Sequence, residues 1–322
     1  MPQSQDKADI VLGHEKTELR FAQALAERRL HHAWLLYGVH GIGKRMLAEQ
    51  LAARYLCEGE ASQQQACGAC HGCRMLAASS HPDFTFIGRE EKKRDITIAQ
   101  VRDLQSFLAM SGRESEKRVA ILDGADSMNL QAANALLKGL EEPPAGSLLL
   151  IVCHNMIRIP ATIRSRCMLE HCSPLADEFM QQILQRLPVA EDAMPMLYEM
   201  AQGCPGRVMA LQDKAVADAC MGWHALTQNV VKADVADVQA WMQQYVTLVP
   251  HDLIVGVVYA HVARLIQSAT VSFDVREHVF AAMKDWLCWP KEVQMHSLRP
   301  APTLLSRYMD LRSALREVEV TH

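Results

Sequence analysis

Apolar and helical segments alternate along the first half of the chain. Four apolar-rich segments are typical of strands that are buried on both faces of a sheet: 33–38, 83–88, 118–123 and 147–153. The segment 168–172 is a candidate for a short fifth strand. Four other segments place apolar residues at helical spacing: 14–30, 45–57, 97–110 and 129–142. Pro143 and Pro144 stop the last of these helices. The alternation predicts an α/β fold with a parallel sheet covered by helices on both faces.

The second half of the chain has a different pattern. Helical periodicity dominates from Pro174 onwards, and no segment there resembles a core strand. The sequence GCPG at 203–206 marks a turn between helices. We therefore expect a parallel-sheet domain at 1–173, a small helical domain at 174–212 and a separate helical domain at 213–322.

Composition narrows the class of protein. The 322 residues suffice for two or three domains, and a net charge of −4 excludes a strongly basic nucleic-acid binder, although a local basic patch is compatible with it. The chain has no apolar run of 18 residues and no apolar signal core at its start. We expect a cytoplasmic protein whose 10 cysteines are thiols or metal ligands rather than disulfides.

A glycine-rich loop, GVHGIGKR at 38–45, lies between a predicted strand and a predicted helix. In this setting backbone N–H groups and a helix N-terminus converge on an anion. The candidate nucleotide-binding residues of the loop are Gly38, Gly41, Gly43, Lys44 and Arg45. Arg45 replaces the Ser or Thr that coordinates magnesium, and a guanidinium only donates hydrogen bonds. The loop could hold phosphate without magnesium-dependent hydrolysis, or it could be a tight turn without a ligand.

A second part of the hydrolytic machinery is missing as well. Asp123 ends the apolar strand 118–123, where P-loop enzymes place a carboxylate near magnesium. A solvated strand end is the alternative interpretation of this residue. ATPases of the AAA+ kind usually carry Glu at the next position, as the base that orients the attacking water, whereas this chain has Gly124. The two replacements predict a non-hydrolysing member of an AAA+ assembly.

Four cysteines form a cluster in the sequence. Cys57, Cys67, Cys70 and Cys73 have the spacing C-x9-C-x2-C-x2-C, which matches a closed, structural zinc site. His71 could compete as a ligand, and four buried thiols without a metal are the alternative. The other six cysteines are expected in the apolar core: Cys153, Cys167, Cys172, Cys204, Cys220 and Cys288.

Several motifs, in this order and spacing, resemble the clamp-loader subunits of bacterial DNA polymerase III: HHAWLLYGVHGIGK, CGACHGC, HPDF, NALLKGLEEPP and TIRSRC. The resemblance covers roughly residues 8–173, and GCPGRVMAL at 203–211 extends it. It implies a RecA-like AAA+ domain with a zinc knuckle at about 57–73, a helical lid at 174–212 and a helical collar domain at 213–322.

Within that family the chain is similar to the delta-prime type. The ATP-hydrolysing tau/gamma motor type carries Thr or Ser after the loop lysine and Glu after the strand aspartate, whereas this chain has Arg45 and Gly124. His154, in the segment after the fourth strand, lies where motor subunits often have threonines. The sequence HPD at 81–83 also resembles delta-prime. The alternatives are an ATP-hydrolysing motor of the tau/gamma type and a zinc-dependent DNA-binding module unrelated to replication.

Two arginines gain a role from the resemblance. On the sequence alone, a solvated surface arginine is the better interpretation of Arg166 in the SRC motif. The resemblance implies that Arg166 acts in trans as an arginine finger on the ATP site of an adjacent gamma subunit, and that Arg207 lies at the nucleotide-sensing position of the lid. Bound ATP or ADP would then be possible without autonomous ATPase activity.

The resemblance also implies partners. It predicts a hetero-pentamer with gamma/tau and delta subunits, within the nucleotidyltransferase holoenzyme, that opens the sliding clamp and places it on primed DNA. Contact with DNA would be to the backbone and independent of sequence.

Overall fold

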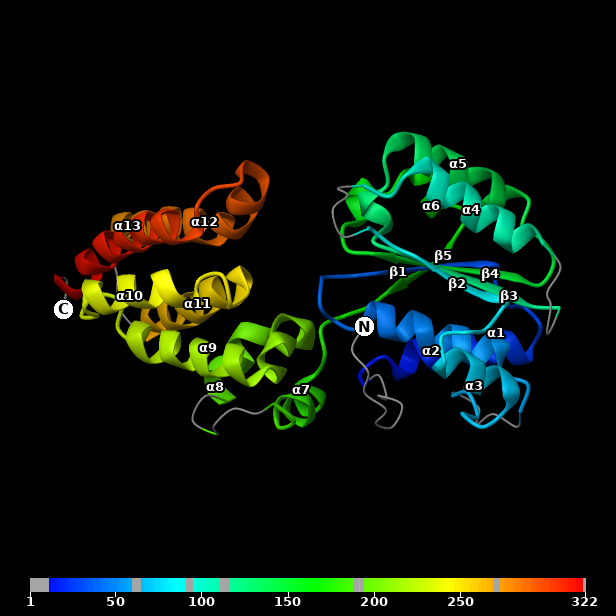
Figure 1. Ribbon diagram of the computed structural model, residues 1–322, viewed down its shortest axis with the longest axis horizontal. Helices are drawn as coiled ribbons and strands as arrows, with labels where there is room; N and C mark the ends of the chain where they lie inside the picture. Colours follow the sequence, from blue (N-terminus) through cyan, green and yellow to red (C-terminus); the bar gives the residue numbers. More distant parts are fainter. Residues whose placement is uncertain are drawn as a thin grey trace. The chain divides into compact units, whose positions relative to one another are not determined.

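We describe the protein from a computed structural model, which divides into two compact units, residues 1–176 and 177–322 (Figure 1). The structure describes residues 12–59, 65–90, 95–110, 116–187, 191, 194–268 and 273–320. Residues 60–64, within the predicted zinc knuckle, lie outside the described residues. Each unit is described by itself.

The first unit is built on a five-stranded parallel sheet. Its strands are β1 (Ala33–Tyr37), β2 (Phe84–Ile87), β3 (Arg118–Asp123), β4 (Ser147–Cys153) and β5 (Met168–His171). They are ordered β2-β3-β4-β1-β5, and every pairing is parallel. All five predicted strands are confirmed. Because parallel strands end at one edge of the sheet, the segments after β1, β3 and β4 meet there.

Helices cover both faces of this sheet. Figure 1 shows α1 (Glu15–Ala26), α2 (Lys44–Leu56) and α3 (His71–Ala77) on one face, and α4 (Ile98–Ala109), α5 (Leu130–Glu141) and α6 (Ala161–Arg164) on the other. Two short 3₁₀ segments follow strands, η1 (Ala125–Ser127) after β3 and η2 (Met156–Arg158) after β4. The predicted α/β fold with a doubly covered parallel sheet is confirmed.

The core of the first unit explains why the apolar segments become strands. Leu35, Ala120 and Ile151, from three adjacent strands, are fully buried together with Leu104 of α4 and Leu136 of α5. Burying a side chain of this size stabilises the fold by about 1.5–3 kcal/mol. The sheet and helices therefore form a rigid base for the loops at the carboxyl edge.

The described part of the second unit is helical. Its longer helices are α7 (Asp177–Leu184), α8 (Met194–Ala201), α9 (Lys214–Thr227), α10 (Val235–Tyr245), α11 (His251–Ser268), α12 (Phe273–His296) and α13 (Pro300–Val320). Short 3₁₀ segments occur at η4 (Pro205–Arg207) and η5 (Met209–Gln212). None of the helices in the described ranges is long and apolar enough to cross a membrane. The predicted division of this unit into a lid and a collar at about residue 212 stays a prediction.

Aromatic side chains form the core of the second unit. Trp223, Trp286 and Tyr308 are fully buried, and the Trp223 ring lies 4.6 Å from that of Trp241. The indole N–H of Trp223 donates to the Ile254 carbonyl at 3.0 Å, so the polar edge of the ring is satisfied. Of the cysteines predicted in the core, Cys288 is exposed, and that prediction is wrong. The residue lies on α12 one position before the buried Trp289, and a helix turns adjacent residues to different directions.

Candidate functional site

The glycine loop, residues 38–45, joins the end of β1 to the start of α2. Gly38 lies against the backbone after β5, where a Cβ atom would come within 2.2 Å of the Cys172 carbonyl oxygen. Gly43 caps α2 with a left-handed φ of 88°. Gly41 lies between them at a φ of 84°. Both conformations favour glycine, and with them the loop connects the carboxyl end of β1 to the N-terminus of α2.

Lys44 is the first residue of α2, and its side chain folds back onto the loop. Its Nζ donates to the carbonyl oxygens of Gly38 at 2.8 Å and Val39 at 2.6 Å. The residue is only 3% exposed. Burial lowers the pKa of Lys44, while the nearby Asp123 and Asp126 act in the opposite direction. A phosphate that enters the loop must compete with two internal hydrogen bonds for this ammonium.

Arg45 points its guanidinium along the side of α2. Its Nε donates to Glu49 Oε1 at 2.9 Å, and its guanidinium carbon lies 4.3 Å from the centre of the Phe86 ring. A cation over an aromatic face is attracted by the ring quadrupole. The position that carries a hydroxyl in magnesium-dependent ATPases is therefore taken by a cation with partners of its own.

The segment after β3 makes a tight turn that starts with a glycine. Asp123 ends β3, and Gly124 has φ 74° and ψ 41° in the left-handed region. Ser127 closes the turn with its backbone N–H at 2.8 Å and its hydroxyl at 2.7 Å from the Gly124 carbonyl. A side chain at position 124 would cost roughly 1–2 kcal/mol in this conformation. Position 124 carries no carboxylate, and its backbone conformation disfavours a residue that would supply one.

Polar residues next to the glycine loop interact across the carboxyl edge. The His154 backbone N–H donates to Asp126 Oδ1 at 2.9 Å, and its Nδ1 lies 3.5 Å from the same oxygen. Burial would raise the pKa of Asp126, but the bonds from His154 outweigh it and lower the pKa to about 2. The rings of His40 and His154 lie 4.8 Å apart. Our sequence reasoning missed Asp126, since only the folded edge brings η1 and the end of β4 together.

The two candidate arginines lie in different units. Arg166 follows α6; its guanidinium contacts Glu141 Oε1 at 2.8 Å and donates to the Thr162 carbonyl at 3.0 Å. Its side chain is 37% exposed. Arg207 ends η4 in the second unit and donates to Gln202 Oε1 at 2.8 Å. The structure thus brings the glycine loop and Asp123 together at the carboxyl edge of the sheet. Arg166 contacts Glu141 and Thr162 instead.

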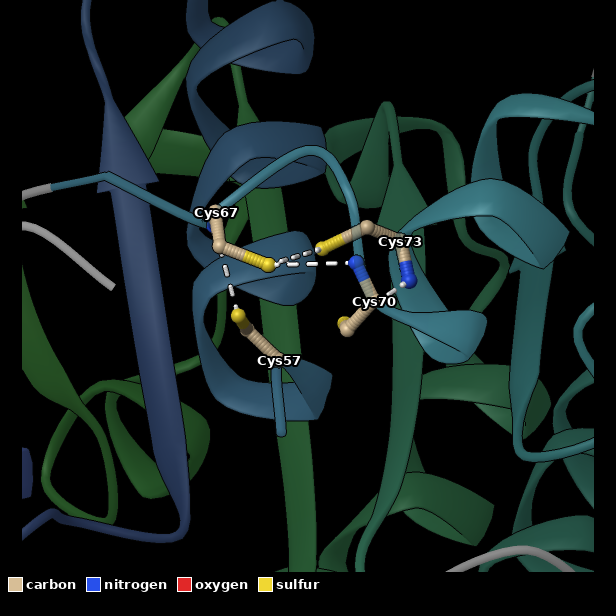
Figure 2. Close-up of side chains that lie close together, drawn as sticks. All are labelled: Cys57, Cys67, Cys70 and Cys73. Atoms are coloured by element: carbon tan, nitrogen blue, oxygen red, sulfur yellow. Dashed lines mark hydrogen bonds between the residues drawn. The ribbon is translucent and has the colours of Figure 1, made fainter. Parts of the chain in front are cut away.

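The four clustered cysteines converge in space (Figure 2). Cys57 follows α2, Cys70 caps α3, and Cys73 lies within α3. All four sulfur atoms lie within 4.8 Å of one another, and those of Cys67 and Cys73 are 3.9 Å apart. Tetrahedral zinc with Zn–S bonds of about 2.3 Å separates its sulfur ligands by about 3.8 Å. The donor set and its spacing fit one closed, four-coordinate metal site.

Backbone hydrogen bonds further prepare the sulfur atoms for a metal. The N–H groups of Cys67, Cys70 and Cys73 point to the sulfur of the preceding cysteine in the cluster at 3.3, 3.3 and 3.4 Å. Bonds from the Cys73 and Glu58 backbone lower the pKa of Cys70 to about 6. A thiolate is the form that binds metal, so these bonds favour the ligand state at Cys70, whereas burial raises the pKa of Cys73 in the absence of a metal.

The HPD sequence after the cluster ties it to the sheet. His81 is buried; its Nδ1 accepts from the Asp83 backbone N–H at 3.1 Å, and its ring packs against Gly72 of α3. Asp83 is fully buried and pairs with Arg118, the first residue of β3, at 3.4 Å. Arg118 also donates to the Phe107 carbonyl at 2.8 Å. Sequence reasoning noted the HPD motif and missed Arg118.

The fold and the glycine loop after β1 define the class of protein, a RecA-like AAA+ domain followed by helices. A family model described as "DNA polymerase III, delta subunit" matches residues 13–176. The DNA polymerase III delta-prime subunit of Pseudomonas aeruginosa is 40% identical over 189 residues, which cover 58% of this chain and 57% of that protein. The delta-prime subunit of Escherichia coli is 32% identical over 184 residues (57% and 55%). The chain belongs to the family of DNA polymerase III delta-prime subunits.

More distant relatives match a larger share of the chain. The DNA polymerase III tau subunit of Escherichia coli is 30% identical over 216 residues, 65% of this chain and 33% of that protein. A DNA polymerase III gamma subunit-related protein from Thermotoga maritima superposes with a TM-score of 0.56 at 16% identity, over 92% of this chain and 99% of that one. The latter likeness supports the fold alone. The chain matches little more than half the length of its delta-prime relatives.

Proposed function

We propose that this chain is a non-hydrolysing, stator-type subunit of the DNA polymerase III clamp loader. The absent chemistry at the glycine loop carries this proposal. Arg45 offers no oxygen to magnesium, and the left-handed Gly124 offers no carboxylate to orient water. In this proposal the gamma/tau subunits of the clamp loader hydrolyse ATP. This chain contributes a residue to the ATP site of a neighbouring subunit.

Arg166 is the residue that we propose for this contribution. It acts in trans as an arginine finger, placing its guanidinium on the γ-phosphate in the ATP site of a neighbouring gamma/tau subunit. Its partial exposure and its position after α6 support the role, because a finger must be reachable by a partner. An arginine of this kind stabilises the charge that develops on the phosphoryl group and can contribute about 10³–10⁵ in rate.

The degenerate site could still bind ATP or ADP. The loop amides at the start of α2 and Lys44 supply groups for a nucleotide that is not turned over, and the resemblance adds Arg207 as a nucleotide-sensing residue. The hydrogen bonds of Lys44 to its own loop support weak binding at most. We propose that a nucleotide bound here has a structural effect only.

The remaining assignments follow from the same proposal. The cysteine cluster holds structural zinc, residues 174–212 form the lid, and residues 213–322 form a collar that joins the gamma/tau and delta subunits in a hetero-pentamer. The complex opens the sliding clamp and places it on primed DNA in the cytoplasm. The net charge of −4 supports the proposal that DNA is bound by the assembled complex rather than by this chain alone, through contacts with the DNA backbone.

A clamp loader reconstituted with Arg166→Ala tests the proposal. We expect a clear loss of ATP turnover and clamp loading, although this subunit hydrolyses nothing, and little effect of Lys44→Ala in the same complex. Unchanged turnover and loading in the Arg166→Ala complex refute the finger. The motor alternative predicts magnesium-dependent ATP turnover by the purified chain that Lys44→Ala abolishes, and this result refutes the stator.

A further inference from the structure

We propose that Glu141 is the positioning residue for Arg166, orienting its guanidinium for the neighbouring ATP site; this inference rests on the proposed function. Glu141 is the last residue of α5, and Arg166 follows α6. Twenty-five positions separate them in the sequence, yet Glu141 Oε1 lies 2.8 Å from Arg166 Nη2. The pair links the central helix of the sheet face to the segment that carries the finger.

Contacts within the subunit hold the guanidinium at both of its Nη atoms. Besides Glu141 at Nη2, its Nη1 donates to the Thr162 carbonyl at 3.0 Å and to the Ser165 hydroxyl at 3.4 Å. These contacts occupy three of the five N–H donors of the group. Two donors are therefore left, among the residues that the structure describes, for the oxygens of a phosphate. These contacts fix the orientation of the Arg166 guanidinium before the neighbouring subunit binds. The side chain therefore loses less rotamer entropy when it contacts the phosphate.

The position of the Glu141 carboxylate is unfavourable for the stability of helix α5. Glu141 lies at the C-terminal end of α5, where the helix dipole is negative and an acidic side chain is unfavourable. The side chains of the pair are 50% and 37% exposed, so the pair itself contributes little to stability. The stability of the fold therefore does not explain a carboxylate at position 141, whereas a role in orienting Arg166 does.

The experiment uses the reconstituted clamp loader with Glu141→Ala in this subunit. We expect clamp loading and ATP turnover to fall about 2- to 5-fold, the range that follows from the strength of an exposed ion pair. Glu141→Gln retains an acceptor oxygen and should recover part of the rate. The melting temperature of the isolated chain should not fall, because the negative end of α5 loses a repulsive charge.

Two controls separate positioning from a structural effect. Glu142→Ala removes the adjacent carboxylate at the same helix end and should leave the rate unchanged. In an Arg166→Ala background, Glu141→Ala should have no further effect, since its partner is gone. An equal loss in both backgrounds overturns the inference, and so does a wild-type rate for Glu141→Ala in a complex that Arg166→Ala impairs. If Arg166→Ala changes nothing, the finger and this inference fail together.

Discussion

The buried pair between Asp83 and Arg118 makes the most direct test of how the HPD motif acts. Asp83→Asn removes the negative charge and leaves the Arg118 guanidinium in a site where the two side chains are 0% and 5% exposed. Removing one partner of a buried pair typically costs about 3–5 kcal/mol. The separation of 3.4 Å is long for a charged hydrogen bond, and the Phe107 carbonyl and ring remain with Arg118. We therefore expect a cost near the lower limit, about 3 kcal/mol.

Hydrogen–deuterium exchange of the β2 and β3 amides measures this cost locally, within the first of the two units. Asp103→Asn, the same substitution at an exposed position of α4, is the matched control. Replacing both partners, with Asp83→Asn and Arg118→Met together, should recover most of the loss, because no buried charge is left unpaired. A loss below about 0.5 kcal/mol in Asp83→Asn would contradict the reasoning, since a change that small is typical of surface substitutions.

Two further predictions concern the metal site and the acid end of the pH range. Cys70→Ser should abolish stoichiometric zinc binding, measured by elemental analysis, and lower the melting temperature, whereas Cys288→Ser, at the exposed cysteine, should do neither. The pKa of Asp126 is lowered to about 2, so its bonds with His154 stabilise the fold above the unfolded pKa of about 4 and lose that effect as the pH falls to 2. Asp126→Asn should therefore cost about 2 kcal/mol in unfolding free energy at pH 7 and almost nothing at pH 2; an equal cost at both would refute the assignment.

Local patterns predicted the elements of the first unit well. The strands and the glycine loop depend on runs of neighbouring residues, and the four cysteines depend on short spacings, so each is visible in the sequence. In the second unit, the predicted burial of Cys288 was wrong, because apolar neighbours along a helix do not determine the direction of one side chain.

Contacts between distant segments could not be predicted. The pairing of Asp83 with Arg118 depends on β2 lying beside β3, and that of Asp126 with His154 depends on the end of β4 meeting η1. The internal bonds of Lys44 depend on how the loop folds back. Each is fixed by the order of the strands and by packing, which periodicity does not encode.

The left-handed turn at Gly124 has a consequence for any attempt to engineer this edge of the sheet. The backbone at position 124 has φ 74°, and Ser127 closes the turn by donating to the Gly124 carbonyl. A carboxylate at position 124 would therefore bring a strain of roughly 1–2 kcal/mol, and a different turn would be needed to relieve it. A hydroxyl in place of Arg45 is a separate change in a separate loop, so no single substitution supplies both groups.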